Sequence, residues 1–174
     1  PTLYPRIAGQ SERYIAQQLA LFKSGERANA IMQPFATGLS AQDMRDIGAY
    51  FASQKVVPGI ADESPITSGP NQGRKFFQVG ERLFRAGNPA QGVPACQACH
   101  GREGVGIMGI YPTLTGQHAD YLEESLKAYR SGARKNGIMA PFASQLKPED
   151  VRLVAKYYAK QKPSLKTVPM REGK

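Results

Sequence analysis

Apolar residues recur at helical spacing in two separate stretches of the chain. In each stretch they fall on one face of a helix: Tyr14, Ile15, Leu19 and Phe22 in the first, and Tyr121, Leu122, Leu126 and Tyr129 in the second. A glycine follows each stretch, Gly25 or Gly132, where a helix commonly stops. The pattern therefore predicts two amphipathic helices that end at these glycines.

A second helix is predicted after each of the first two. One begins near Ser40, a good N-cap residue, and the other near Pro148, which suits a first helical turn. Their apolar stripes are Met44, Ile47 and Phe51 in one copy and Val151, Val154 and Tyr158 in the other. Between the helices of each pair we expect a loop that contains a methionine and a Pro-Phe pair.

The two helix pairs are copies of one another. When the chain is shifted by 107 positions, residues 4–55 align with residues 111–162 without a gap, and 22 of the 52 positions are identical. The agreement is strongest from Asn29 to Ala36, which align with Asn136 to Ala143. Self-similarity of this kind indicates a duplicated domain.

The repeat divides the chain into a first domain at 1–55, incomplete at its start, and a second domain at 71–162. Residues 56–70 are rich in proline and glycine and are predicted to be a linker, and residues 163–174 to be a tail. A further helix is predicted at roughly 72–85. Because no segment alternates as a strand does, the expected fold is all-α.

The chain contains one motif with a specific chemistry, Cys96-Gln97-Ala98-Cys99-His100. Two thiols with two residues between them, followed at once by a histidine, are typical of covalent haem c attachment, in which the histidine binds the iron. A zinc site would need both cysteines and both histidines, His100 and His118, to converge. A thioredoxin-like pair would need a βαβ pattern, which is absent from the sequence.

Met139 is the candidate for the second axial ligand of the iron. It follows His100 by 139 − 100 = 39 residues, and a thioether suits haem iron. The alternative is a flexible core residue, the usual role of methionine. Of the five methionines, only Met32 and Met139 align with each other in the repeat. Met32 is therefore the candidate ligand of a haem in the first domain.

Other residues near the motif have less specific roles. The carbonyl group of Tyr111 or Pro112 can accept a hydrogen bond from the second ring nitrogen of a ligating histidine; the alternative is that Pro112 serves only to form a turn. His118 aligns with Ser11 and is predicted at a helix start or on the surface. For the aligned pair Arg27 and Arg134 we expect solvated side chains; the alternative is that they pair with haem propionates or with an acidic partner.

The charge balance of 23 − 14 = +9 favours acidic partners or anionic lipid surfaces. Nucleic acid is disfavoured as a partner because the basic residues are dispersed and no base-reading motif accompanies them. The chain has no apolar run of eighteen residues, so no spanning helix is predicted.

The series Cys-x-x-Cys-His-Gly, Tyr-Pro-x-Leu-x-Gly-Gln, Ser-Gly-x-Arg and Met-x-Pro-Phe-Ala resembles the cytochrome c4 family. The resemblance implies two tandem class I cytochrome c domains, each with one His/Met-ligated haem c. It implies a periplasmic electron carrier, not an enzyme, that is loosely membrane-associated at most. Its partners would be an upstream electron donor and a terminal oxidase. The alternative is a haem c subunit of a periplasmic oxidoreductase complex.

One feature departs from the family pattern. The first repeat has no Cys-x-x-Cys-His, whose expected place, 96 − 107 = −11 to 100 − 107 = −7, lies before Pro1. We expect the natural polypeptide to begin earlier and to carry a second haem there. The alternative is a degenerate first domain and a single haem.

Overall fold

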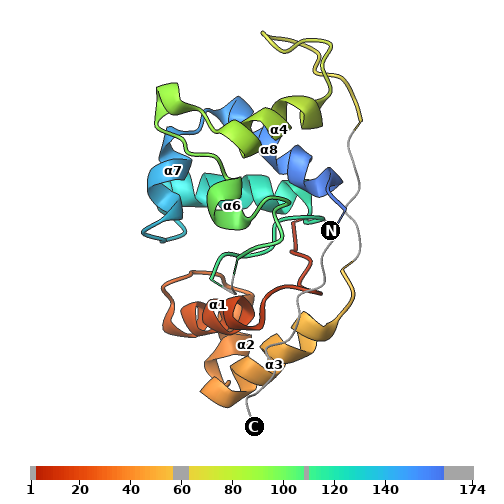
Figure 1. Ribbon diagram of the computed structural model, residues 1–174. Coiled ribbons are helices and arrows are strands. Elements are labelled where there is room, and N and C mark those ends of the chain that lie inside the picture. Colours follow the sequence, from red (N-terminus) through yellow and green to blue (C-terminus); the bar gives the residue numbers. More distant parts are fainter. Residues whose placement is uncertain (1–2, 57–62, 108–109, 163–174) are drawn as a thin grey trace.

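The computed structural model describes residues 3–56, 63–107 and 110–162, and this part of the chain is helical without strands (Figure 1). The predicted all-α fold is confirmed. In chain order the elements are α1 (Glu12–Ser24), α2 (Met32–Thr37), α3 (Ala41–Ser53), α4 (Phe76–Ala86), the 3₁₀ turn η1 (Pro89–Gln91), α5 (Gln97–His100), α6 (Ala119–Ser131), α7 (Met139–Gln145) and α8 (Pro148–Lys160). No helix in these residues is long and apolar enough to cross a membrane.

The helix ends follow the sequence signals. Gly25 and Gly132 adopt left-handed conformations, with φ of 79° and 77°, and close α1 and α6. Ser40 caps α3 through the amide of Asp43, whose carboxylate accepts a hydrogen bond from the Ser40 amide in return. His118 is the N-cap residue of α6, as predicted. The predicted tail, residues 163–174, and residues 57–62 of the linker lie outside the described residues.

The prediction of methionine loops was wrong, because the segments form the short helices α2 and α7. The side-chain oxygen of Asn29 accepts hydrogen bonds from the amides of Ile31 and Met32, at 3.0 and 2.8 Å. Asn136 makes the same two bonds in the second copy. An asparagine that binds the first amides starts a helix, and proline is tolerated in the first turn.

The cores of the two halves differ in size. In the second half α4 packs on α8, with Phe84 and Val151 almost fully buried. The helices are in close contact at Gly80, where a Cβ atom would overlap the carbonyl oxygen of Leu153. The first half, residues 3–56, has a smaller core of Ile15, Leu19 and Met44, onto which partly buried neighbours pack.

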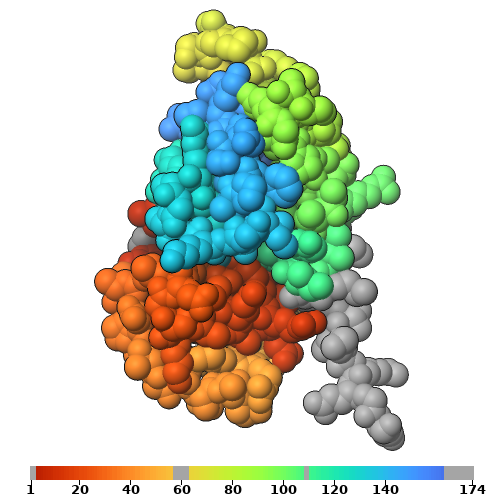
Figure 2. All heavy atoms as spheres, turned by 90° about the vertical axis from the view of Figure 1, so that its left-hand side faces the viewer, coloured from red at the N-terminus to blue at the C-terminus, as the bar shows by residue number. Residues whose placement is uncertain are grey.

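The two halves contact each other through a reciprocal pair of glutamines. Gln10 and Gln117 are equivalent in the repeat. The Gln10 amide pairs with both backbone groups of Thr113, each at 2.9 Å, and the Gln117 amide pairs with both backbone groups of Arg6, at 2.8 and 2.9 Å. Figures 1 and 2 show the two halves stacked on each other, with α1 facing α6 across the interface between them.

Arg27 and Arg134 lie at the same interface, where their backbones form an isolated antiparallel bridge. The Arg134 guanidinium donates to the Tyr14 hydroxyl at 2.8 Å, and the Arg27 guanidinium donates to the Tyr121 hydroxyl at 3.1 Å. Arg134 is only 7% exposed and Arg27 is half-buried, so the expectation of solvated side chains was wrong. The interface buries the two arginines because tyrosine hydroxyls from the opposite half accept their hydrogen bonds.

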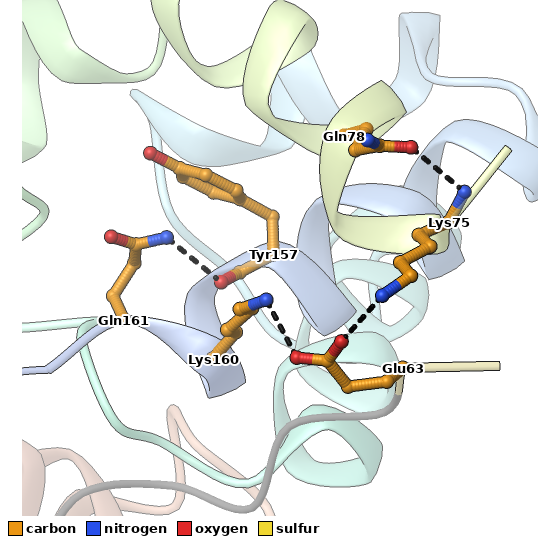
Figure 3. A network of polar contacts seen from close by, with 6 residues as sticks. All are labelled: Glu63, Lys75, Gln78, Tyr157, Lys160 and Gln161. Atoms are coloured by element: carbon orange, nitrogen blue, oxygen red, sulfur yellow. Dashed lines mark hydrogen bonds and ion pairs between the residues drawn. The ribbon is translucent and has the colours of Figure 1, made fainter.

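The described end of the linker is fixed to the second half. Figure 3 shows Glu63 between Lys75, at the start of α4, and Lys160, at the end of α8. Both ammonium groups lie 2.7 Å from the carboxylate. The ammonium group of Lys160 also lies 3.3 Å from the centre of the Phe77 ring. Glu63 therefore ties the chain that enters the second half to both helices of its core.

Candidate haem site

The attachment motif folds into one short helical turn. Cys96 is the N-cap residue of α5, and the His100 amide donates to the Cys96 carbonyl at 2.9 Å. Gly101 follows with a positive φ of 80°, which glycine adopts without strain, and so the chain turns away directly after the histidine. The turn brings Cys96, Cys99 and His100 together.

His100 has the orientation that an iron ligand requires. Its Nδ1 atom lies 3.0 Å from the carbonyl oxygen of Pro112. Because a carbonyl oxygen only accepts hydrogen bonds, Nδ1 carries the proton and Nε2 has a free lone pair. Nε2 is buried and has no hydrogen-bond partner within the described part of the chain. Burial lowers the pKa of His100, which favours the neutral, ligating form.

The two cysteines are free thiols, both partly buried. Burial raises the pKa of the Cys96 thiol to about 11, so it is protonated at neutral pH. A protonated thiol in an apolar core is not an exposed redox cysteine. It does suit addition to a haem vinyl group, which ends in an uncharged thioether.

The same residues do not form a zinc site. Within residues 3–56, 63–107 and 110–162, no three His, Cys, Asp or Glu side chains gather so as to hold a metal ion. His118 is the N-cap residue of α6, and its backbone amide donates a hydrogen bond to the side chain of Gln117. The buried, unpartnered Nε2 beside two free thiols instead fits covalently bound haem.

Comparisons with known proteins identify the family of the chain. The family model described as cytochrome c matches residues 77–162. A cytochrome c4 of Pseudomonas aeruginosa is 40% identical over 159 residues, which are 88% of this chain and 74% of that protein. The chain belongs to the cytochrome c4 family. The crystal structure of reduced recombinant cytochrome c4 from Pseudomonas stutzeri is similar, with a TM-score of 0.82 at 36% identity over 93% of this chain and 87% of that one.

A further relative has a more specific name. A thiosulfate dehydrogenase electron acceptor of Stutzerimonas stutzeri is 36% identical over 159 residues, which cover 90% of this chain and 70% of that protein. Membership of the cytochrome c4 family makes this chain an electron carrier with covalent haem c, and Cys96 and Cys99 are its attachment site. The predicted fold of tandem class I cytochrome c domains is confirmed.

The methionines of the two repeats have matching places. Met139 is the first residue of α7 and is partly buried, and Met32 is the first residue of α2, where it packs against the core of the first half. The first half has neither cysteine nor histidine, so no other residue of the attachment motif accompanies Met32 there.

Sequence reasoning missed two residues close to the site or to the interface. The hydroxyl of Tyr158 is buried beside Cys96, and Gln18 accepts hydrogen bonds from both Arg27 and Arg134, at 2.6 and 2.9 Å. Each differs from its repeat partner, Phe51 or Ser125, and that difference was the available signal.

Proposed function

We propose that this member of the cytochrome c4 family is a periplasmic carrier that passes single electrons toward a terminal oxidase, with His100 and Met139 as the axial ligands in the second domain. The proposal is carried by His100, whose Nε2 is buried and free while Nδ1 is fixed by Pro112. When bound, haem c supplies a one-electron couple between ferric and ferrous iron. If His100 and Met139 both bound the iron, no coordination position would be left for a substrate, which favours the role of a carrier over that of an enzyme.

The residues around the site hold the haem in place, orient its histidine ligand and set its reduction potential. Cys96 and Cys99 hold the haem permanently on the protein. The Pro112 carbonyl keeps the His100 ring in one orientation and one tautomer, which limits rearrangement when the charge of the site changes. The thioether of Met139 favours the reduced form and so raises the reduction potential.

The transfer can be followed directly by stopped-flow absorbance. The reduced protein is mixed with membranes that contain a haem–copper oxidase, and its reoxidation is recorded at increasing salt. We expect rapid reoxidation that slows as salt rises, because a carrier of formal charge +9 is steered to an acidic surface. Reoxidation no faster than with oxygen alone would exclude the oxidase as partner.

A second candidate places the protein beside a sulfur-oxidising enzyme. One relative is named as the electron acceptor of thiosulfate dehydrogenase. A thiosulfate dehydrogenase of Marichromatium purpuratum is similar over 91% of this chain but only 33% of that one, with a TM-score of 0.79 at 29% identity. Mixing the oxidised protein with such a dehydrogenase and thiosulfate tests this function. Reduction only when all three are present would support a place as acceptor or subunit.

For the first domain we propose a second haem c, with Met32 as one axial ligand. Tyr50 and Tyr157 are equivalent, yet Tyr50 is 62% exposed whereas Tyr157, beneath α4, is 2% exposed. A helix equivalent to α4, followed by a second Cys-x-x-Cys-His, would cover Tyr50 and give Met32 a metal to bind. Small domains also depend on such covalent links for stability.

Mass spectrometry of the intact natural protein distinguishes the two possibilities. We expect a mass that contains two haem groups, together with peptides that precede Pro1 and include a Cys-x-x-Cys-His sequence. A mass with one haem would make Met32 a remnant of the duplication, while the site at Cys96 and Cys99 would stand.

A further inference from the structure

Two polar atoms beside the attachment motif are buried without a hydrogen-bond partner in the described part of the chain: His100 Nε2 and the hydroxyl of Tyr158. The iron of haem accounts for the first. Nothing in the electron-carrier role accounts for the second. A buried hydroxyl without an acceptor is unfavourable, and such groups in native proteins call for an explanation.

The Tyr158 ring is fixed in place. Tyr158 is 3% exposed on α8, and its ring lies 5.3 Å from the ring of Phe84 and 5.8 Å from that of Tyr157, centre to centre. On another side Gly104 leaves room for it, since a Cβ atom there would lie 2.7 Å from a ring carbon of Tyr158. Enclosed in this way, the hydroxyl cannot turn out to solvent.

The polar group next to this hydroxyl is the sulfur of Cys96. Cys96 packs against the core cluster that contains Tyr158. Burial raises the pKa of Tyr158 well above its usual range, and the neighbouring Cys96 thiol raises it further. The hydroxyl and the sulfur thus interact, although the hydroxyl makes no aligned hydrogen bond in this structure.

The first repeat shows that packing alone does not require this hydroxyl. Phe51 is the equivalent of Tyr158 and has the same ring without the oxygen. Phe51 packs, partly buried, against the core of its own half. The oxygen is therefore an additional feature of the second half, where Cys96 packs against the same core.

We propose that Tyr158 is a positioning residue for the haem, whose hydroxyl donates a hydrogen bond to Cys96 Sγ once that sulfur is part of the thioether. Attachment adds the thiol across a haem vinyl group: the sulfur bonds to one vinyl carbon, its hydrogen goes to the other, and no electrons are gained or lost. The product sulfur has no hydrogen and can only accept, which gives the buried hydroxyl its partner. This inference rests on haem attachment at Cys96.

The hydrogen bond has a consequence for the carrier. A donor to the thioether sulfur draws electron density from the haem edge. Because the reduced haem has one electron more, this withdrawal stabilises the reduced state more than the oxidised state. Tyr158 is therefore expected to raise the reduction potential of this haem, and Tyr158→Phe is expected to lower it.

The test uses the haem-loaded protein and resonance Raman spectroscopy of its reduced state. The protein is unfolded and refolded in H₂O or in D₂O, so that the buried hydroxyl exchanges, and the carbon–sulfur stretching bands are compared. We expect a deuterium shift of one such band in the wild type and none in Tyr158→Phe. Tyr157→Phe, which removes the neighbouring hydroxyl of the same core, is the matched control and should keep the shift.

The midpoint potential is measured on the same samples. It should fall in Tyr158→Phe and stay unchanged in Tyr157→Phe. No deuterium shift in a wild type with an intact haem spectrum overturns the proposal without needing any variant, and so does an unaltered midpoint in a folded Tyr158→Phe. Absence of haem bands from the purified protein would instead overturn attachment at Cys96, a different failure.

Discussion

Arg27 and Arg134 hold equivalent positions in the two repeats and share one acceptor, the side-chain oxygen of Gln18. Within the described residues no carboxylate lies within ion-pairing distance of either guanidinium. The interface therefore stabilises two cations with neutral oxygens and aromatic faces: the Tyr129 ring centre lies 4.6 Å from Arg134, and the Phe22 ring centre 4.5 Å from Arg27.

Replacing Arg134 by lysine should weaken this interface. The Arg134 guanidinium donates to Tyr14 and Gln18 and at the same time lies over the Tyr129 ring. A lysine ammonium keeps the charge but cannot make all three contacts, because it lacks the planar group with several N–H donors. We expect the free energy of unfolding to fall by about 1–3 kcal/mol, the cost of leaving buried partners unpaired. Denaturant unfolding measures the change. Lys135→Ala, at the exposed neighbouring position, is the control and should stay within about 0.5 kcal/mol. An unchanged free energy of unfolding in Arg134→Lys would contradict the role given to the guanidinium.

The contact between α4 and α8 predicts a second sensitive position. An alanine at Gly80 would place its Cβ atom against the carbonyl oxygen of Leu153, which is backbone and cannot rotate away. The two helices must therefore move apart. We expect the free energy of unfolding to fall by about 1–3 kcal/mol or more, as it does for other overpacked cores. Gly137→Ala meets nothing within 4 Å and should be nearly neutral. Equal unfolding midpoints for the two variants would contradict this packing.

Most of the fold was predictable because the chain contains it twice. Apolar spacing identified α1, α3, α6 and α8, and the glycines after α1 and α6 gave their ends. The short helices α2 and α7 were missed because their start depends on side-chain hydrogen bonds of Asn29 and Asn136, and apolar spacing does not register such bonds. The Cys-x-x-Cys-His motif identified the attachment site because its spacing is fixed by the chemistry of the haem edge.

The interface was not predictable from one repeat at a time. Arg134 has the residue type and the sequence neighbours of a surface position, since it follows Ser131 and Gly132 and precedes Lys135. It is buried only because the other copy supplies Tyr14 and Gln18. Alignment of the repeat marked the arginine pair as equivalent, but which face of each half meets the other is a tertiary property.

The Glu63 bridge should respond to acid. Hydrogen bonds from Lys160 and then Lys75 lower the pKa of the Glu63 carboxyl from 4.5 to about 2. Since the folded state has the lower pKa, the bridge stabilises the fold above about pH 4.5, and this contribution disappears as the pH falls through 2. Glu63→Gln should therefore unfold at lower denaturant than the wild type at pH 6, and the two midpoints should converge toward pH 2.

A double-mutant cycle separates the bridge from other effects of pH. Once Glu63 is glutamine, the further change Lys75→Gln should have little effect on the unfolding midpoint at any pH, whereas in the wild type it should lower the midpoint at pH 6. High salt should shrink the wild-type effect, since all three side chains are solvent-accessible. A difference that persists unchanged at pH 2 would assign the effect of Glu63→Gln to packing instead of charge.

Met139 gives the last prediction, which concerns the proposed second axial ligand. Met139→Ala removes a thioether from the start of α7, where Asn136 holds the backbone, so the short helix can persist without it. If the sulfur binds the iron, the oxidised variant should lose the part of the sulfur-to-iron charge-transfer band that belongs to the second-domain haem, and the midpoint potential of that haem should fall because a methionine ligand favours the reduced form. Met108→Ala and Met170→Ala, at two positions outside the described residues, are the controls and should keep both properties. An unchanged band in Met139→Ala at full haem content would transfer the ligand role to one of them.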